Sequence, residues 1–106
     1  INCIMSAGGG VNNGVYEVAR EKGKYAVGVD MAQNYISPKV ILTSAIKKVD
    51  VGVENTIKSF LDNNLEGGTT IIYSIKNDGV TYEKTDLLSD ETIKFIDKKM
   101  KELKSK

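Results

Sequence analysis

The chain has 106 residues, a length that suits one domain and is sufficient for a hydrophobic core. Its 15 basic and 14 acidic residues give a net charge of +1, which gives no indication of a nucleic-acid footprint or of attraction to an anionic membrane. Histidine is absent, which removes the commonest general base and metal ligand, and no apolar run is long enough to span a bilayer.

The N-terminal residues carry no secretion signal. The chain begins at Ile1 without a basic segment or a signal-like apolar stretch, so we expect it to be processed or cut from a longer protein. Cys3 is the single cysteine and lacks the apolar stretch that precedes a lipidation site, so it is expected to be a small buried residue on the first strand. One cysteine cannot form an internal disulfide and therefore does not indicate the compartment.

The first expected unit is a strand, a glycine turn and a helix. Residues 1–5 are apolar, which predicts a short buried strand, and residues 8–10 are glycines. Asn12 or Asn13 is expected to cap the following helix, which ends at Gly23. The apolar face of this helix is expected at Val15, Val18 and Ala19.

Two strands and a second helix are expected in the middle of the chain. Residues 25–29 and 40–46 predict short buried strands, separated by a loop at residues 31–39. The second helix is expected to begin near Lys48 or Val49. Its apolar residues recur at helical spacing, at Val49, Val53, Ile57, Phe60 and Leu61.

The last part of the chain predicts a hairpin and a final helix. Residues 69–75 have strong strand propensity, and the Asn-Asp-Gly turn at residues 77–79 would join them to a return strand at residues 80–82. Ser89 is expected to cap the final helix, which has acidic residues in its first turn. Its apolar face is expected at Ile93, Ile96, Met100 and Leu103.

The order of these elements indicates an α/β fold. Short apolar strands that alternate with helices are typical of a largely parallel sheet flanked by helices. The chain has no internal repeat, low-complexity tract or domain linker, so one unit over residues 1–106 is expected.

The glycines of residues 8–10 lie where a strand meets a helix, which lets backbone N–H groups approach a ligand. The segment is not a P-loop, because no Gly-Lys-Ser/Thr follows. It also misses a dinucleotide fingerprint, because Asn13 stands where the third glycine should be and Gly14 follows one position late. A ligand-binding turn and a purely structural tight turn are both open on this pattern.

Asp30 and Lys47 are the charged candidates for a binding site. Asp30 follows a strand, and ligands of open α/β sheets bind outside the carboxyl ends of strands. Its carboxylate could accept hydrogen bonds from two vicinal sugar hydroxyls, although it could instead brace the next loop. Lys47 stands just before the second helix, where a lysine is usually solvated.

The chain resembles the C-terminal part of the basic membrane lipoprotein family. The likeness covers nearly the whole chain and rests on several spaced motifs that occur in the family's order. These are Ala-Gly-Gly-Gly-Val-Asn-Asn-Gly-Val-Tyr-Glu at residues 7–17, Glu-Lys-Gly-Lys-Tyr-Ala-Val-Gly-Val-Asp at 21–30, Thr-Ser-Ala-Ile-Lys-Lys-Val-Asp at 43–50, Gly-Gly-Thr-Thr at 67–70 and Leu-Ser-Asp-Glu at 88–91.

The resemblance implies a purine-nucleoside-binding lipoprotein of an ABC transporter, with a periplasmic-binding type I fold. The chain would be its C-terminal lobe and would bind ligand in a cleft against a missing N-terminal lobe. The glycine turn would place backbone near the nucleoside, Asp30 would hold ribose hydroxyls, and Lys47 rather than Lys48 would contact the ribose. The implied site residues are Gly8, Gly9, Gly10, Asp30 and Lys47.

Further expectations concern partners and location. The absence of histidine and of metal-ligand clusters and the balanced charge lead us to expect no catalysis, cofactor, metal or nucleic-acid partner, and the resemblance implies an ABC permease as partner. It also implies an extracytoplasmic location on the bacterial cell membrane, through a lipid anchor outside these residues. A homodimer of the isolated chain is a side expectation, because the surface meant for the missing lobe would be exposed.

Departures from the family pattern leave rival ligands and functions open. The family usually has Thr-Gly where this chain has Val11 and Asn12, and it often has a second acidic residue where this chain has Ala32. One alternative is a related binding protein for a sugar or another small molecule. The other is a Rossmann-like nucleotide-using enzyme domain, which should keep the third glycine and bring catalytic groups.

Overall fold

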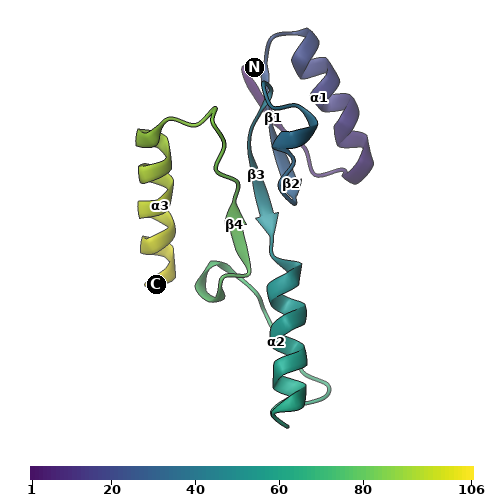
Figure 1. Cartoon of the computed structure of the whole chain (residues 1–106), viewed down its shortest axis with the longest axis vertical. Coiled ribbons are helices and arrows are strands. Elements are labelled where there is room, and N and C mark those ends of the chain that lie inside the picture. Colours follow the sequence, from purple (N-terminus) through teal and green to yellow (C-terminus); the bar gives the residue numbers. More distant parts are fainter.

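Four strands form one open sheet, and three α-helices lie around it (Figure 1). The computed structural model describes the whole chain, residues 1–106. The strands are β1 (Cys3–Met5), β2 (Tyr25–Asp30), β3 (Ile41–Lys47) and β4 (Val80–Tyr82), and the helices are α1 (Asn12–Glu21), α2 (Val49–Leu61) and α3 (Asp90–Lys104). The sheet order is β1-β2-β3-β4, with the first three strands parallel and β4 antiparallel to β3. The expected α/β class with a largely parallel sheet is confirmed.

The core lies between α1 and the pair β2–β3. Its members are the buried residues Tyr16, Ala19, Ala26, Val40 and Ile41. Helix α1 forms the crossover between β1 and β2, as a parallel strand pair requires, and this connection places the helix against the sheet. Only 10 of the 106 residues are buried, so the chain covers little of its own apolar surface.

Helix α2 projects beyond the end of the sheet and gives the molecule an elongated shape (Figure 1). The principal extents are 53 × 31 × 20 Å, and the Cα radius of gyration is 16.7 Å against about 13 Å for a compact domain of this length. The predicted apolar stripe of α2 exists but faces solvent, with exposed fractions from 54% at Val53 to 71% at Leu61. None of the helices has the length and apolar character needed to cross a bilayer.

The prediction that the first strand and Cys3 are buried is wrong. Strand β1 is the edge of the sheet, and all of its residues, Cys3 included, are exposed. Ile4 and Met5 retain 42% and 57% of their surface. Apolar sequence identified the strand correctly, but no further element covers its outer side.

The predicted hairpin of residues 69–75 with 80–82 is also wrong. Residues 69–74 form no strand and are followed by a 3₁₀ turn at Ile75–Asn77. The backbone N–H of Ser74 donates to Asn77 Oδ1, and Asn77 Nδ2 donates to the Ile72 carbonyl, so local side-chain bonds replace ladder bonds. Strand β4 pairs with β3 instead, with Lys47 opposite Val80.

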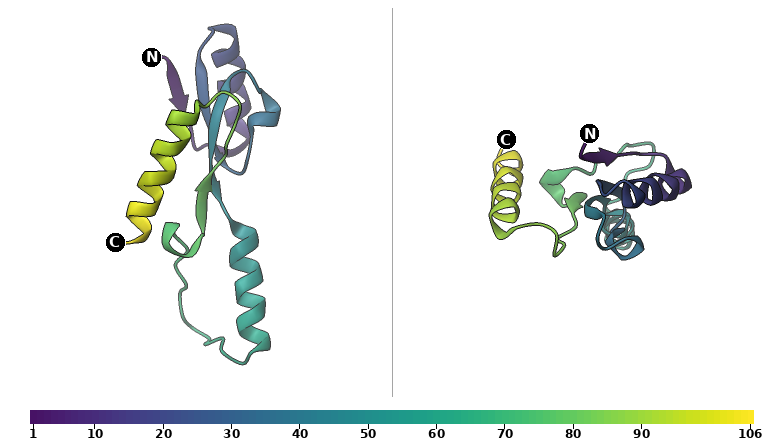
Figure 2. Two further views of the ribbon diagram at one scale, coloured as in Figure 1. Left: turned by 60° about the vertical axis from the view of Figure 1, so that its left-hand side comes forward. Right: turned by 90° about the horizontal axis from the view of Figure 1, so that it is seen from above.

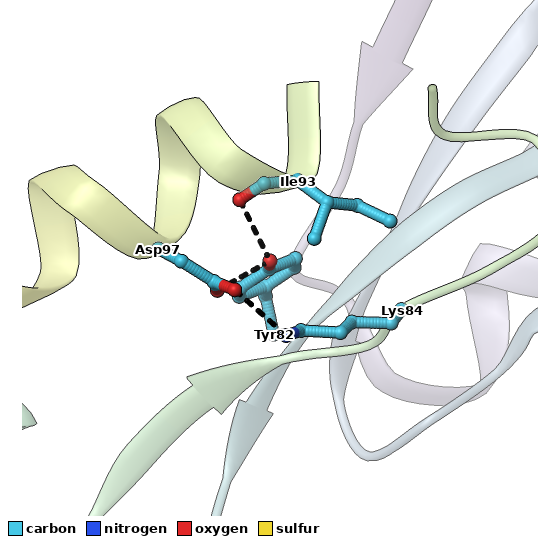
Figure 3. A network of polar contacts seen from close by, with 4 residues as sticks. All are labelled: Tyr82, Lys84, Ile93 and Asp97. Carbon is cyan, nitrogen blue, oxygen red and sulfur yellow. Dashed lines mark hydrogen bonds and ion pairs between the residues drawn. The ribbon is translucent and has the colours of Figure 1, made fainter. Parts of the chain in front are cut away.

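Helix α3 lies on the opposite side of the molecule from α1 (Figure 2) and is joined to the sheet by polar contacts. The Tyr82 hydroxyl donates to Asp97 Oδ1 at 2.7 Å, and Lys84 Nζ lies 2.8 Å from Asp97 Oδ2 (Figure 3). Ser89 caps the helix as predicted, because its side chain accepts from the Thr92 N–H. Burial and the hydrogen bond to Asp97 raise the pKa of Tyr82 to about 12.

Candidate ligand-binding site

The three segments singled out in the sequence follow the carboxyl ends of three adjacent parallel strands. The glycine turn follows β1, Asp30 is the last residue of β2, and Lys47 is the last residue of β3. The strands are parallel, with Met5 opposite Val27 and Asp30 opposite Ile46, so the three segments lie at the same end of the sheet. The arrows of the three strands point toward this end of the sheet (Figures 1 and 2). Open α/β sheets bind their ligands in this position.

Asp30 and Lys47 form an ion pair at this end of the sheet. Lys47 Nζ lies 3.2 Å from Asp30 Oδ1, and the two side chains are 64% and 61% exposed, so the pair is solvated and adds little to stability. Asp30 also has a φ of 75°, in the left-handed region that non-glycine residues adopt at a cost. Asn63 and Asp78 have the same left-handed conformation, so the φ of Asp30 does not by itself distinguish a binding residue.

Lys47 and Lys48 both border the groove beside α2, but only Lys48 also borders the hollow at Asp78. Lys48 is half-buried and lines this small hollow together with Asp78. The pKa of Asp78 is lowered mainly by its hydrogen bond with Lys104, and the charge of Lys48 adds to this effect. Of the two lysines, only Lys47 is paired with Asp30.

The glycine turn presents bare backbone at the start of α1. Gly9 has a φ of 63°, and no atom lies within 4 Å of the place where a Cβ on Gly9 or Gly10 would stand. A Cβ on Gly8, in contrast, would lie 2.5 Å from Val11 Cγ2, so a side chain there would displace the exposed Val11 side chain. The backbone on the open side is therefore accessible to a ligand.

Asn12 holds this turn in place, although it does not cap the helix as predicted. The N-cap position is Val11, and no side chain caps it. Asn12 is 3% exposed, and its Oδ1 accepts from the Ser6 hydroxyl at 2.7 Å and from the Gly8 N–H at 3.1 Å. Its Nδ2 donates to the Ser6 carbonyl at 3.0 Å. The asparagine thus fixes the route from β1 into the glycine turn.

Glu83 is a residue of this region that sequence reasoning missed. It directly follows β4, and its Oε2 accepts from the Ser44 hydroxyl at 2.8 Å and from the N–H groups of Gln33 and Asn34 at 3.1 and 3.2 Å. The carboxylate therefore ties the loop after Asp30 to β3. A glutamate in a polar segment looks like a surface charge, and nothing in its spacing links it to the loop.

Tyr16 holds the same loop from the other side. It is 2% exposed, its hydroxyl donates to Gln33 Oε1, and burial raises its pKa. Gly28 leaves room for the loop, because a Cβ there would collide with the Ser44 hydroxyl and lie 3.1 Å from Gln33 Cβ in the loop. The loop is thus fixed by residues from α1, β2, β3 and the end of β4.

Of the candidate site residues, the two larger hollows of the chain reach only Lys47. A groove of about 660 Å³ runs between β1 and α1 and is mainly apolar, and another of about 510 Å³ lies between α2 and residues 73–80. Lys47 borders the second, whereas Gly9 and Asp30 border neither. The candidate site is therefore an open surface rather than an enclosed pocket.

Comparison with known proteins decides the family. The model of the Bmp family, described as ABC transporter substrate-binding protein PnrA-like, matches residues 1–106. The chain belongs to this family. Over 104 residues it is 33% identical to basic membrane protein D of Borreliella burgdorferi (strain JD1), a match that covers 95% of this chain and 30% of the relative. Basic membrane protein A of Borreliella burgdorferi (strain ATCC 35210 / DSM 4680 / CIP 102532 / B31) is 35% identical, with 92% and 30% covered.

Solved structures share the fold of this Bmp-family chain. A crystal structure described as a transcriptional activator of the comK gene from Bacillus halodurans has a TM-score of 0.86 at 25% identity and covers 95% of this chain and 36% of its own. An ABC transporter solute-binding protein from Aeropyrum pernix K1 has a TM-score of 0.66 at 21% identity, with 97% and 28% covered. Because these two carry different descriptions, the fold alone does not define the function.

The family description gives a class of function for its members. The Bmp family consists of substrate-binding proteins of ABC transporters, which bind solutes and do not transform them, so the family is non-enzymatic. This agrees with the expectation of a binding protein and disfavours the Rossmann-like enzyme. The chain spans about a third of the length of the relatives it matches, 30% for the two named here.

Proposed function

We propose that this chain forms one wall of a cleft that binds a purine nucleoside, in a solute-binding lipoprotein that serves an ABC importer. The observation that supports it most is that the glycine turn, Asp30 and Lys47 lie at the same end of the sheet. There Lys47 Nζ lies 3.2 Å from Asp30 Oδ1. Family membership supplies the transport context. The nucleoside is the further step, and it rests on the chemistry of these residues and on the resemblance described above.

The side chains suit a ribose. The Asp30 carboxylate accepts hydrogen bonds and could bind two vicinal hydroxyls at once, and the Lys47 ammonium donates to a hydroxyl oxygen beside them. Gly9 and Gly10 add backbone N–H groups near the start of α1, where acceptors are favoured. When the ligand binds, hydrogen bonds between its sugar hydroxyls and the side chains of Asp30 and Lys47 replace the solvated ion pair.

The second wall of the cleft is assigned to residues beyond this chain. We assign residues 1–106 to the C-terminal lobe of a two-lobed protein that closes around its ligand. The exposed stripe of α2 and the open sheet edge at β1 fit a chain that normally packs against more protein. The other lobe would also supply aromatic groups that stack on the base, a contact that contributes about 1–3 kcal/mol.

The partners follow from the same assignment. The ligand-loaded protein would dock on an ABC permease, and a lipid outside residues 1–106 would anchor it on the outer side of the bacterial cell membrane. The net charge of +1 gives no support for a nucleic-acid partner.

A thermal-shift screen of the two-lobed protein tests the proposal. Inosine, guanosine and adenosine should raise the melting temperature, because a ligand that binds only the folded state stabilises it. Free ribose should have a much smaller effect, since it lacks the base. A shift with ribose or another sugar but none with nucleosides would favour a sugar-binding relative, and a shift with NAD alone would favour a nucleotide-using domain.

A further inference from the structure

The loop after Asp30 is held by one carboxylate oxygen. Oε2 of Glu83 accepts from the Gln33 N–H, the Asn34 N–H and the Ser44 hydroxyl, at 3.1, 3.2 and 2.8 Å. Ser44 is fully buried, and its hydroxyl also accepts from the Gln33 N–H at 3.0 Å. Backbone bonds support this junction, because the Glu83 N–H donates to the Ser44 carbonyl at 2.9 Å. The carboxylate therefore stands on a rigid base.

The clamped amides lie very close to the strained residue of the candidate site. Only Met31 and Ala32 separate Asp30 from Gln33. A non-glycine residue keeps a left-handed conformation such as the φ of 75° at Asp30 only where its surroundings impose it. Paired strands hold the backbone before Asp30, and the Glu83 clamp holds the backbone after it.

We propose that Glu83 is a positioning residue of the ligand site: its clamp on Gln33 and Asn34 imposes the left-handed conformation of Asp30 and so directs the Asp30 carboxylate to Lys47 and to the ligand. Its effect on binding rests on the proposed function, whereas its effect on Asp30 does not. Glu83 acts through hydrogen bonds and does not touch the ligand.

The clamp needs an acceptor oxygen and does not need a charge. All three donors meet the same oxygen, so the amide oxygen of Glu83→Gln can take its place, whereas Glu83→Ala leaves two backbone N–H groups without this partner. Gly28→Ala reaches the same loop without altering Glu83, because its Cβ would collide with the Ser44 hydroxyl. Glu66→Ala is the matched control, since Glu66 is exposed in the turn after α2 and far along the chain from the loop.

NMR on the full chain tests the effect on Asp30 without any ligand. In wild type and Glu83→Gln, we expect the amides of Gln33 and Asn34 to exchange slowly and Asp30 to show the strong intraresidue HN–Hα NOE of a positive φ. In Glu83→Ala both features should be lost while the dispersion of the β2–β3 amides persists. Glu66→Ala should match the wild type, and Gly28→Ala should disturb the loop in the same sense as Glu83→Ala.

Calorimetry with inosine on the two-lobed protein tests the effect on binding. Glu83→Ala should weaken binding about threefold to tenfold and Glu83→Gln less than about threefold, since one net hydrogen-bond contribution is at stake. Intact protection and an unchanged NOE at Asp30 in Glu83→Ala would overturn the proposal, and so would Glu83→Gln behaving like Glu83→Ala. If wild type binds no nucleoside while the NMR changes occur as described, the proposed function fails and the positioning of Asp30 by Glu83 stands.

Discussion

The half of the molecule around β2 and β3 and the half around α2 bury their apolar residues to very different extents. In the first, Ala26 and Ile41 are fully buried under α1. In the second, the stripe of α2 is largely exposed, with Ile57 at 54% and Phe60 at 67%. Both segments are apolar at the spacing of their secondary structure.

The difference shows what an apolar pattern reports. It identifies the face that an element buries, but it does not say which part of the protein covers that face. Helix α1 returns directly onto β2, so its cover is local in the chain. Helix α2 leads away from the sheet, and the residues that follow it form no strand or helix until the 3₁₀ turn at Ile75–Asn77. We therefore expect the two halves to respond differently to substitution.

The largest expected difference is between Ile41→Ala and Ile57→Ala. Ile41→Ala removes a fully buried side chain and should lower the free energy of unfolding by about 2–5 kcal/mol. Ile57→Ala truncates an exposed residue and should change it by less than about 0.5 kcal/mol. Urea unfolding of the chain measures both. A large loss from Ile57→Ala would mean that α2 is covered in the isolated chain, for example by a second copy.

The next effect concerns ligand binding at Asp30. A hydrogen bond to a charged group contributes about 1.5–3 kcal/mol, so Asp30→Ala should weaken nucleoside binding to the two-lobed protein at least about tenfold. Loss of the solvated Asp30–Lys47 pair should change unfolding of the isolated chain little, but alanine at a φ of 75° should itself cost about 1 kcal/mol, because aspartate tolerates the left-handed region better. Unchanged affinity by calorimetry would refute the role of Asp30.

The two lysines give a smaller and more specific effect. Lys47→Ala should weaken nucleoside binding about threefold or more, because Lys47 faces Asp30. Lys48→Ala should leave the affinity near the wild-type value, because Lys48 lies beside Asp78. Both variants belong in one calorimetric series. The reverse order of effects would place the site on the other lysine.

A further effect is a pH dependence of the α3 attachment. The pKa of Tyr82 rises from 10.0 to about 12, first through burial and then through the hydrogen bond to Asp97, so this stabilisation is complete below pH 10 and is lost as pH rises to about 12. Tyr82→Phe should cost roughly 1 kcal/mol at neutral pH. The difference from wild type in urea unfolding should shrink as pH rises through this range.

The acid side of the same contact has the opposite sign. Hydrogen bonds from Lys84 and Tyr82 lower the pKa of Asp97 below its usual 3.8, so the stabilisation is present above that value and is lost as pH falls below it. Asp97→Asn should therefore remove the acid dependence of this contact. A difference between Tyr82→Phe and wild type that stays constant up to pH 12 would show that Tyr82 does not titrate with the fold.

Local patterns allowed much of the fold to be predicted. The three parallel strands, the three helices and the Ser89 cap follow from short apolar runs, helical spacing and capping preference. The strand propensity of residues 69–75 led to a wrong prediction. The side chain of Asn77 bonds the backbone there, and no neighbouring strand pairs with this segment. The burial of β1 failed for a related reason, since an edge strand needs a neighbour that this chain does not supply.

The sequence indicated the glycine turn and the charged residues of the candidate site, but not the residues that hold them in place. The sequence indicates Asp30 and Lys47 as separate strand-end residues, and the parallel register brings them together. Tyr16 and Glu83 could not be found in this way. Their partners lie 17 residues from Tyr16 and between 39 and 50 residues from Glu83, so the contacts depend on the tertiary fold and leave no periodic signal.

The most direct test of the central claim is an NMR titration of the ¹⁵N-labelled chain with inosine, guanosine and adenosine. If the chain is one wall of a nucleoside cleft, shifts should be confined to the amides of residues 8–10, Asp30 and Lys47 and their neighbours. They should still be growing at millimolar nucleoside, because polar contacts to a ribose in water contribute little net free energy. Saturation at low micromolar nucleoside would show that one wall is enough. Shifts clustered instead at Val53, Ile57 and Tyr73, in the groove beside α2, would place the site elsewhere.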